Sequence, residues 1–170
     1  MSKARKIIIL VHDKFEDMEL NYPYFRLIEA GIEVDIAGEK EGNIYFGKFG
    51  YPVKATKSFD TICYEEYNGI IIPGGYAPDK LRRYESVLNM VKYFDNMKMP
   101  IGQICHAGWV CVSAKILKGR HATSFFAIKD DLINAGAKWF DKKVVIDNNL
   151  VSAQTEKDLP EFMREFINLL

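Results

Sequence analysis

The sequence predicts a doubly wound α/β sandwich, in which helices cover both faces of a mostly parallel sheet. Short, unbroken apolar runs rich in β-branched residues recur along the chain, and such continuous hydrophobic strands are typical of a sheet buried on both faces. Amphipathic helical patterns alternate with these runs, as they do in α/β proteins. Chemically unusual residues directly follow three of the runs, where sites form in such sheets.

The predicted strands are short and apolar. We expect four of them, at residues 6–11, 33–37, 69–72 and 100–104. Two hairpins are predicted besides these. Residues 43–56 hold aromatic and β-branched positions among several glycines, and residues 144–146 and 150–153 flank an Asp-Asn-Asn turn of the hairpin type.

Four helices are predicted, at residues 19–30, 85–97, 108–117 and 158–170. The first, second and last place apolar residues on one face at helical spacing. Gly31 is a stop signal for the first helix, and Asp158 is expected to cap the last, with Pro160 tolerated in its first turn. The third is apolar on nearly all sides, so we expect it to be buried.

The composition fits one globular domain over residues 1–170 and argues against several classes of function. Lysine and arginine together number 23, as do aspartate and glutamate, so the net charge is zero, whereas a nucleic-acid binder normally carries a basic excess. No stretch approaches a membrane span, and no cysteine or histidine spacing indicates a metal; we expect no cofactor. Three cysteines are not a disulfide framework and fit a reducing, cytoplasmic setting.

Cys105 is a candidate nucleophile because it directly follows a predicted strand and precedes a predicted helix. Residues 102–108 read Gly-Gln-Ile-Cys-His-Ala-Gly, and the small residues allow the sharp turn of a nucleophile elbow. A sulfur at a helix N-terminus favours the thiolate, so we expect a lowered pKa for Cys105. The alternative is a buried structural cysteine, the role that we assign to Cys111, whereas Cys63 is either structural or a bystander thiol.

Three further segments are candidates for the same site. His106, next to the cysteine, is a candidate base. Gly74 and Gly75 follow the strand at residues 69–72 and free the backbone to direct N–H groups at a ligand, with a plain loop as the alternative. Glu16 lies beyond the first strand, where a carboxyl can reach a thiol on a neighbouring strand end; otherwise it is a solvated acid before a helix.

Three segments together carry a resemblance to a known family. Residues 15–20 (FEDMEL), 73–79 (PGGYAPD) and 104–108 (ICHAG) resemble the DJ-1/PfpI superfamily, and most closely its PfpI-like branch. The resemblance extends over nearly the whole chain. It implies a flavodoxin-like, three-layer α/β/α sandwich with a cysteine on a strained elbow.

The resemblance also implies roles for individual residues. Cys105 would be the nucleophile and His106 its partner, Glu16 would hydrogen-bond the thiol, and the backbone around Gly75 and His106 would bind an oxyanion. In the PfpI-like branch, an acidic residue from a neighbouring subunit completes a triad. The matching position here is Asp79, which is shorter than the glutamate usual in the family. We therefore expect a homo-oligomer, a dimer or a hexamer, in which Asp79 acts in trans.

The resemblance implies a cysteine hydrolase that acts on small carbonyl compounds or their protein adducts, as glyoxalases and deglycases do. The same nucleophile also fits an intracellular cysteine peptidase, and a redox sensor or chaperone-like protein is the non-enzymatic alternative. His106 and Asp79 favour an enzyme. Past the last hairpin, Gln154 and Glu156 stand where the family often carries an arginine and a proline, which leaves the substrate open.

Overall fold

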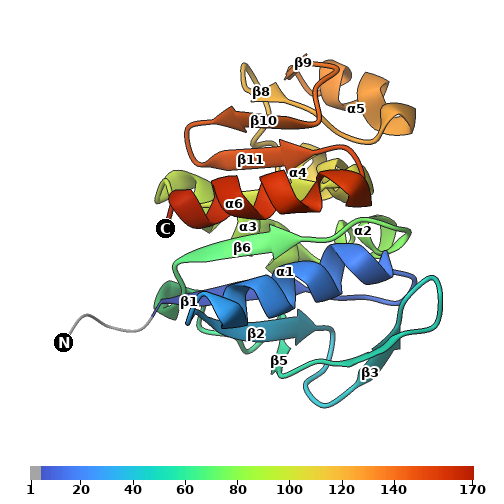
Figure 1. The fold of residues 1–170 in the computed structure, drawn as a ribbon, viewed down its shortest axis with the longest axis vertical. Coiled ribbons are helices and arrows are strands. Elements are labelled where there is room, and N and C mark those ends of the chain that lie inside the picture. Colours follow the sequence, from blue (N-terminus) through green and yellow to red (C-terminus); the bar gives the residue numbers. More distant parts are fainter. Residues whose placement is uncertain (1–4) are drawn as a thin grey trace.

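A computed structural model of the chain describes residues 5–170 and contains a seven-stranded sheet between two layers of helices (Figure 1). The strand order is β10-β11-β7-β6-β1-β2-β5. Every neighbouring pair in this sheet is parallel except β10 and β11, which form an antiparallel hairpin at one edge. The predicted doubly wound sandwich is confirmed.

The central strands are buried along their whole length, as their unbroken apolar sequences predict. Their observed bounds lie within a residue of the predicted ones. The sheet consists of β1 (Lys6–Leu10), β2 (Glu33–Gly38), β5 (Lys57–Ser58), β6 (Gly69–Ile72), β7 (Ile101–Ile104), β10 (Val144–Asp147) and β11 (Leu150–Ala153).

Two small sheets lie outside the main one. The hairpin expected within residues 43–56 is confirmed as β3 (Ile44–Phe46) and β4 (Pro52–Lys54). The other sheet, β8 (His121–Ala122) and β9 (Lys138–Trp139), has two residues in each strand, too few to show a period in the sequence.

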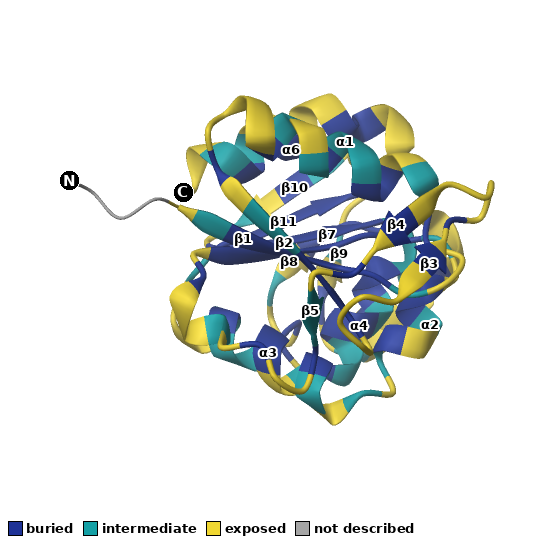
Figure 2. Cartoon of the chain, turned by 90° about the horizontal axis from the view of Figure 1, so that it is seen from below, coloured by how far each residue is buried: buried dark blue, intermediate teal, exposed yellow. Residues whose placement is uncertain are grey.

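The helices cover the sheet on both faces (Figure 2). On one face lie α1 (Asp17–Glu29) and α6 (Leu159–Asn168), which pack against each other. On the other lie α2 (Ala77–Leu81), α3 (Glu85–Asn96) and α4 (Gly108–Ser113). The remaining helix, α5 (Lys129–Asn134), lies beside β8 and β9 at the β10 end of the molecule (Figure 1). Within residues 5–170, no helix combines the length and the apolar character that crossing a membrane requires.

Two helix predictions need correction. The helix expected over residues 108–117 ends at Ser113, because Lys115 adopts a left-handed backbone conformation that interrupts it. Asp158 does not cap α6 with its side chain; it instead accepts the backbone N–H of Thr155 at 3.0 Å, in a capping box around the short 3₁₀ turn Glu156–Asp158. Pro160 lies in the first turn of α6, as expected.

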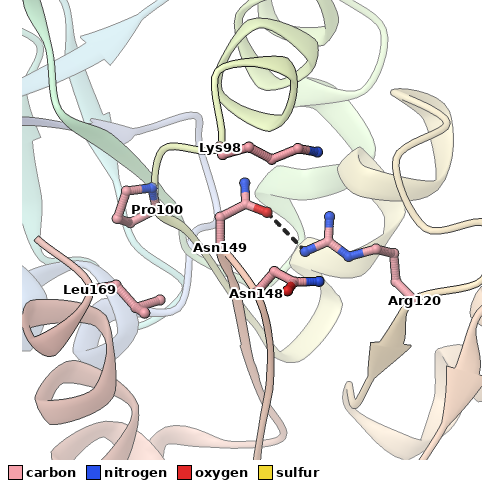
Figure 3. Close-up of a pocket in the computed structure, with 6 residues that line it drawn as sticks. All are labelled: Lys98, Pro100, Arg120, Asn148, Asn149 and Leu169. Atoms are coloured by element: carbon pink, nitrogen blue, oxygen red, sulfur yellow. Dashed lines mark hydrogen bonds between the residues drawn. The ribbon is translucent and has the colours of Figure 1, made fainter.

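Arg120 forms a partly buried ion-pair cluster beside the amino-terminal ends of β7 and β11, and Figure 3 shows its hydrogen bond to Asn149. The Arg120 side chain is 13% exposed, and its guanidinium donates to Asp95 Oδ1 at 2.7 Å, to the backbone carbonyl of Asp147 and to Asn149 Oδ1 at 3.0 Å. Because Asp95 lies on α3 and Asp147 ends β10, this one side chain joins a helix to the edge hairpin. The cluster therefore stabilises the edge of the sheet opposite the strand ends that carry the site.

Replacing Arg120 by alanine leaves two partly buried carboxylates without their cation, so we expect Arg120→Ala to lower the free energy of unfolding by about 2 kcal/mol. Urea unfolding measures this change. Arg164→Ala is the matched control, because that side chain is 65% exposed and its removal is expected to change stability by less than about 0.5 kcal/mol. Equal losses in the two variants would contradict the assignment.

Candidate active site

The candidate site is a cavity of about 280 Å³ at the carboxyl-terminal ends of the strands. It brings together residues that follow β1, β6 and β7, and it includes side chains from more distant loops. The lining residues are Glu16, Glu19, Lys48, Gly75, Tyr76, Cys105, His106, Phe125 and Glu156. Of the six predicted site residues, four therefore line this cavity, whereas Gly74 and Asp79 do not.

The backbone at Cys105 forms the predicted elbow. Strand β7 ends at Ile104 in an extended conformation, and Cys105 then adopts a φ of +60°, which L-residues other than glycine and asparagine rarely visit. A short 3₁₀ turn, Cys105–Ala107, follows and leads into α4. The N–H of Phe125 donates to the Cys105 carbonyl at 3.1 Å and helps to hold the turn. Such strain, on the order of 1 kcal/mol, persists where surrounding contacts enforce it.

Two glycines after β6 bring the neighbouring loops close to the cysteine. Gly75 has a φ of +76°, and a Cβ there would lie 2.4 Å from the backbone nitrogen of Glu16. A Cβ on Gly74 would lie 2.5 Å from Glu19 Oε2 and 2.7 Å from Cys105 Cβ. Only a residue without a side chain fits between that carboxyl and the cysteine, so Gly74 sets their close approach.

Of the two glycines expected to direct N–H groups at a ligand, one does so toward the sulfur and the other does not. Gly75 and His106 direct their N–H groups at the sulfur, where they favour the thiolate and are placed to bind an oxyanion. Gly74, predicted as an oxyanion donor, is not available for that role. Its N–H donates to Glu19 Oε2 at 2.8 Å in a fully buried bond.

Glu19, and not Glu16, is the carboxyl that contacts the thiol. The Glu16 carboxylate forms an ion pair with Lys48, with Oε2 and Nζ 3.1 Å apart, and caps α1 through the N–H of Met18. Glu19 lies one helical turn further on, has no exposed surface, and faces Cys105 across Gly74, whose N–H donates to its Oε2. The expectation for Glu16 was therefore wrong by one turn of α1.

The surroundings of Glu19 favour its protonated form. Burial raises its pKa from 4.5 to about 8, and the opposing effect of the Gly74 N–H is smaller. Its Oε2 accepts from Gly74, while Oε1 has no hydrogen-bond partner among residues 5–170. The carboxylic acid proton is thus free to be shared with the sulfur of Cys105.

Cys105 and His106 form a neutral thiol–imidazole pair. Cys105 Sγ lies 3.2 Å from His106 Nδ1. Burial, followed by the nearby Glu19, raises the pKa of Cys105 to about 12, so the expected lowering at the helix N-terminus is outweighed. Burial also lowers the pKa of His106, which keeps the imidazole neutral and able to accept a proton. Both shifts favour the neutral thiol and the neutral imidazole over the ion pair.

The His106 ring is held between two aromatic side chains. It stacks on Phe125 with centroids 5.0 Å apart and meets Trp109 edge to face at 5.1 Å. With Nδ1 as the acceptor for the thiol, Nε2 carries the hydrogen and needs an acceptor of its own. Among residues 5–170, no such acceptor is bonded to it.

Asp79 does not supply that acceptor within one chain. It lies on α2, its side chain is 48% exposed, and it pairs with Arg83 one turn further along. The structure therefore holds the dyad of Cys105 and His106 but leaves the predicted third member outside the cavity. The prediction that Asp79 acts in trans stays a prediction.

Five lining residues were not predicted as members of the site: Glu19, Lys48, Tyr76, Phe125 and Glu156. Glu19 was detectable, since helical spacing places it on the buried face of α1 with Leu20 and Leu27. Lys48 and Phe125 carry no such signal, because long-range folding of loops brings them to the cavity. Of the two positions that depart from the family pattern, Glu156 lines the cavity and Gln154 instead donates to Asp141 at 2.9 Å.

The raised pKa of Glu19 makes stability depend on pH. Its folded-state pKa lies above 4.5, so this contribution is fully present below about pH 4.5 and is lost as the pH rises through about 8. We expect the wild-type chain to lose up to about 4 kcal/mol relative to Glu19→Gln between about pH 5 and pH 9. Urea unfolding at both values measures it.

Glu29→Gln is the matched control, because Glu29 lies on the same helix with a side chain that is 75% exposed. Its stability should follow that of the wild type at both pH values. Parallel pH dependence of Glu19→Gln and the wild type would show that Glu19 is not held in its protonated form.

Comparison with known proteins places this geometry in a family. The model of the DJ-1/PfpI family matches residues 5–169. "Deglycase PH1704" of Pyrococcus horikoshii is 44% identical over 165 residues, which cover 97% of this chain and 99% of the relative. "Putative cysteine protease YraA" of Bacillus subtilis is 38% identical over 167 residues, covering 98% and 99% of the two chains.

The fold is shared with solved structures. A two-domain protein from Anabaena variabilis, with DJ-1/ThiJ/PfpI-like and ferritin-like domains, superposes with a TM-score of 0.95 at 32% identity. The match covers 96% of this chain and 47% of that longer one. Because the family model spans nearly all of a chain that carries an elbow cysteine at the strand ends, we conclude that this protein belongs to the DJ-1/PfpI family.

Proposed function

We propose that this protein is a cysteine-dependent hydrolase that acts on small carbonyl compounds or their protein adducts, as a glyoxalase or deglycase. The observation that carries the proposal is the 3.2 Å approach of Cys105 Sγ to His106 Nδ1 beside the buried Glu19, in a cavity of about 280 Å³. A cavity of that volume suits a small molecule. The name of the deglycase relative supports the same class of substrate.

The geometry supports addition of the thiol to a carbonyl group. As the sulfur–carbon bond forms, the thiol proton passes from Cys105 to His106 Nδ1, and the electron pair of the carbonyl moves to its oxygen. The N–H groups of Gly75 and His106 stabilise that oxygen as it becomes negative. A protonated Glu19 adds no negative charge beside the sulfur.

A second copy of the chain completes the site in this proposal. His106 Nε2 needs a hydrogen-bond acceptor to hold the tautomer that accepts the thiol proton, and Asp79 is exposed on α2 near the same edge. We propose a homo-oligomer, a dimer or a hexamer built from it, in which the partner's Asp79 accepts from Nε2. The shorter side chain of aspartate then requires a closer approach than glutamate would.

A peptidase is the second candidate, because one relative is named as a putative cysteine protease. The same nucleophile and backbone donors serve acyl transfer. A peptidase also needs room for an extended substrate on both sides of the sulfur, and the observed cavity favours a small molecule. We propose a cytoplasmic location, which agrees with three free cysteines.

Replacing Cys105 by alanine removes the nucleophile, so we expect turnover of methylglyoxal to fall by at least about 1,000-fold. The product, lactate, is measured directly, and casein and a glycated amino acid are tested alongside. Cys63→Ala is the matched control, because that thiol is exposed and lies outside the cavity. Casein cleavage that depends on Cys105, without lactate formation, would favour the peptidase, and full carbonyl turnover by Cys105→Ala would refute both.

If Asp79 of one subunit acts on the Cys105 site of another, two inactive variants should restore activity in each other's presence. We expect Asp79→Ala and Cys105→Ala to be each nearly inactive, and their mixed oligomers to regain about a quarter of the wild-type activity if pairing is random. Unfolding, mixing and joint refolding of the two variants tests this. Asp79→Ala with unchanged kinetics would remove Asp79 from the mechanism, and a mixture without recovered activity would contradict the arrangement in trans.

A further inference from the structure

The turn between β3 and β4 carries Lys48 to the catalytic cavity from a segment remote from the elbow. In Figure 1 this hairpin lies on the side of the molecule toward which the arrowhead of β6 points, as helix α2 does. The Lys48 N–H donates to the Phe15 carbonyl at 2.8 Å. The Asp17 carboxylate accepts the N–H groups of Phe49 at 2.9 Å and of Tyr51 at 3.0 Å. Backbone bonds on both sides thus fix the position of Lys48.

The Lys48 ammonium is held in place but keeps donors free. Its Nζ lies 3.1 Å from Glu16 Oε2, and the Glu16 side chain is 8% exposed. The ammonium also lies 4.9 Å from the centroid of the Phe49 ring. An ammonium has three donors, and one carboxylate oxygen occupies one of them. Two remain for another partner.

Lys48 is the one lysine or arginine among the described residues that line the cavity. Its charge reaches the catalytic groups, because it lowers the pKa of His106, while Glu16 and then Cys105 raise the pKa of Lys48 itself. The Lys48 side chain is 41% exposed, so solvent screens part of its charge, and the remainder stabilises negative charge that develops in the cavity beside it.

We infer that Lys48 is a further catalytic residue, whose ammonium binds the second oxygen of a neutral 1,2-dicarbonyl substrate. This inference rests on the proposed function and deepens it. Gly75 and His106 donate to the oxygen on the carbon that the sulfur attacks. Lys48, reaching the cavity from a different segment, donates to the oxygen on the neighbouring carbon.

The chemical step that needs this donor is a proton shift between the two carbons. After the sulfur has added to an aldehyde, the His106 ring returns the thiol proton to the first oxygen and is neutral again. It then removes the proton from the attacked carbon, a carbon–carbon double bond forms, and the electrons of the neighbouring carbonyl move to its oxygen. Lys48 stabilises this second oxygen while it is negative. His106 then delivers its proton to the neighbouring carbon, and the hydroxyl proton of the attacked carbon passes to the second oxygen, which gives a thioester of a 2-hydroxy acid. Water releases the acid and restores the Cys105 thiol, so no oxidant is required.

The charges around the cavity favour a neutral substrate over a carboxylate. Glu16 already balances the charge of Lys48, and the carboxylate of Glu156 adds a negative charge to the lining. A substrate that carries a permanent negative charge would be repelled by that acid. An oxygen that becomes negative only during the reaction gains from Lys48 without that penalty in the ground state.

The test compares Lys48→Met and Lys48→Arg with the wild type on methylglyoxal, with Lys54→Met as the matched control on the exposed side of the same hairpin. We expect Lys48→Met to lower kcat about 100-fold with less than about a threefold change in KM, and Lys48→Arg to recover part of the loss. With a deuterium on the aldehyde carbon, the isotope effect should rise in Lys48→Met, because proton abstraction becomes slower.

A second measurement separates this role from tuning of the thiol or from damage to the fold. Melting temperatures identify variants with a disturbed fold, in which case Lys48→Arg carries the test. The rate of Cys105 alkylation by iodoacetamide should stay within about threefold of the wild type in Lys48→Met, because the inferred contact forms after the sulfur has added. A parallel fall in alkylation and kcat, or an unchanged kcat and isotope effect, would overturn the inference.

A third measurement tests the preference for neutral substrates. Pyruvate, which carries a carboxylate beside its carbonyl group, should inhibit the wild type and Lys48→Met equally weakly. Inhibition that is strong in the wild type and lost in Lys48→Met would show that Lys48 binds a carboxylate instead. Absence of methylglyoxal turnover in the wild type would reject the proposed function and this inference together, whereas wild-type turnover with an unaffected Lys48→Met rejects the inference alone.

Discussion

The close approach of Glu19 to Cys105 across Gly74 is the constraint on which the rest of the site depends. The carboxyl and the cysteine flank a residue that has no side chain, and the Gly74 N–H anchors Oε2. That approach requires the left-handed backbone at Cys105, which lifts the sulfur out of the line of β7. It also requires α1 to begin where it does, so that its first turn faces the strand ends.

Burial then determines the protonation states. Removing two acids from water favours their neutral forms, and both Glu19 and Cys105 shift in that direction. His106 shifts downward for the same physical reason, since its charged form is the cation. The three groups therefore rest as a neutral set. Charge develops when the sulfur adds to a substrate and its proton passes to His106. The backbone donors and Lys48 can then stabilise the negative charge on the substrate.

Local sequence patterns were sufficient to predict the α/β sandwich and the elbow at Cys105. They were insufficient to predict the contacts between distant segments that complete the site. The strand before Cys105 and the helix after it are visible as adjacent patterns, so the turn between them follows. Glu16 and Glu19 are three residues apart, and distance from the end of the first strand alone selected Glu16 as the carboxyl beside the thiol. Helical spacing selects Glu19 instead, since it shares the buried face of α1 with Leu27. The pKa of Cys105 depends on whether burial or the helix dipole has the larger effect. The extent of burial depends on the whole fold, so no local sequence pattern predicts it.

The fastening of the β3–β4 hairpin also determines how a molecule can enter the cavity. The hydrogen bonds that hold its tip end on Phe15 and Asp17, in the segment that leads into α1. The tip cannot swing outward without displacing the start of that helix, and with it Glu16 and Glu19. Tyr76 and Phe125 form a different part of the rim, and their side chains are 70% and 37% exposed. Both aromatic residues are therefore accessible to an arriving substrate while the hairpin stays in place.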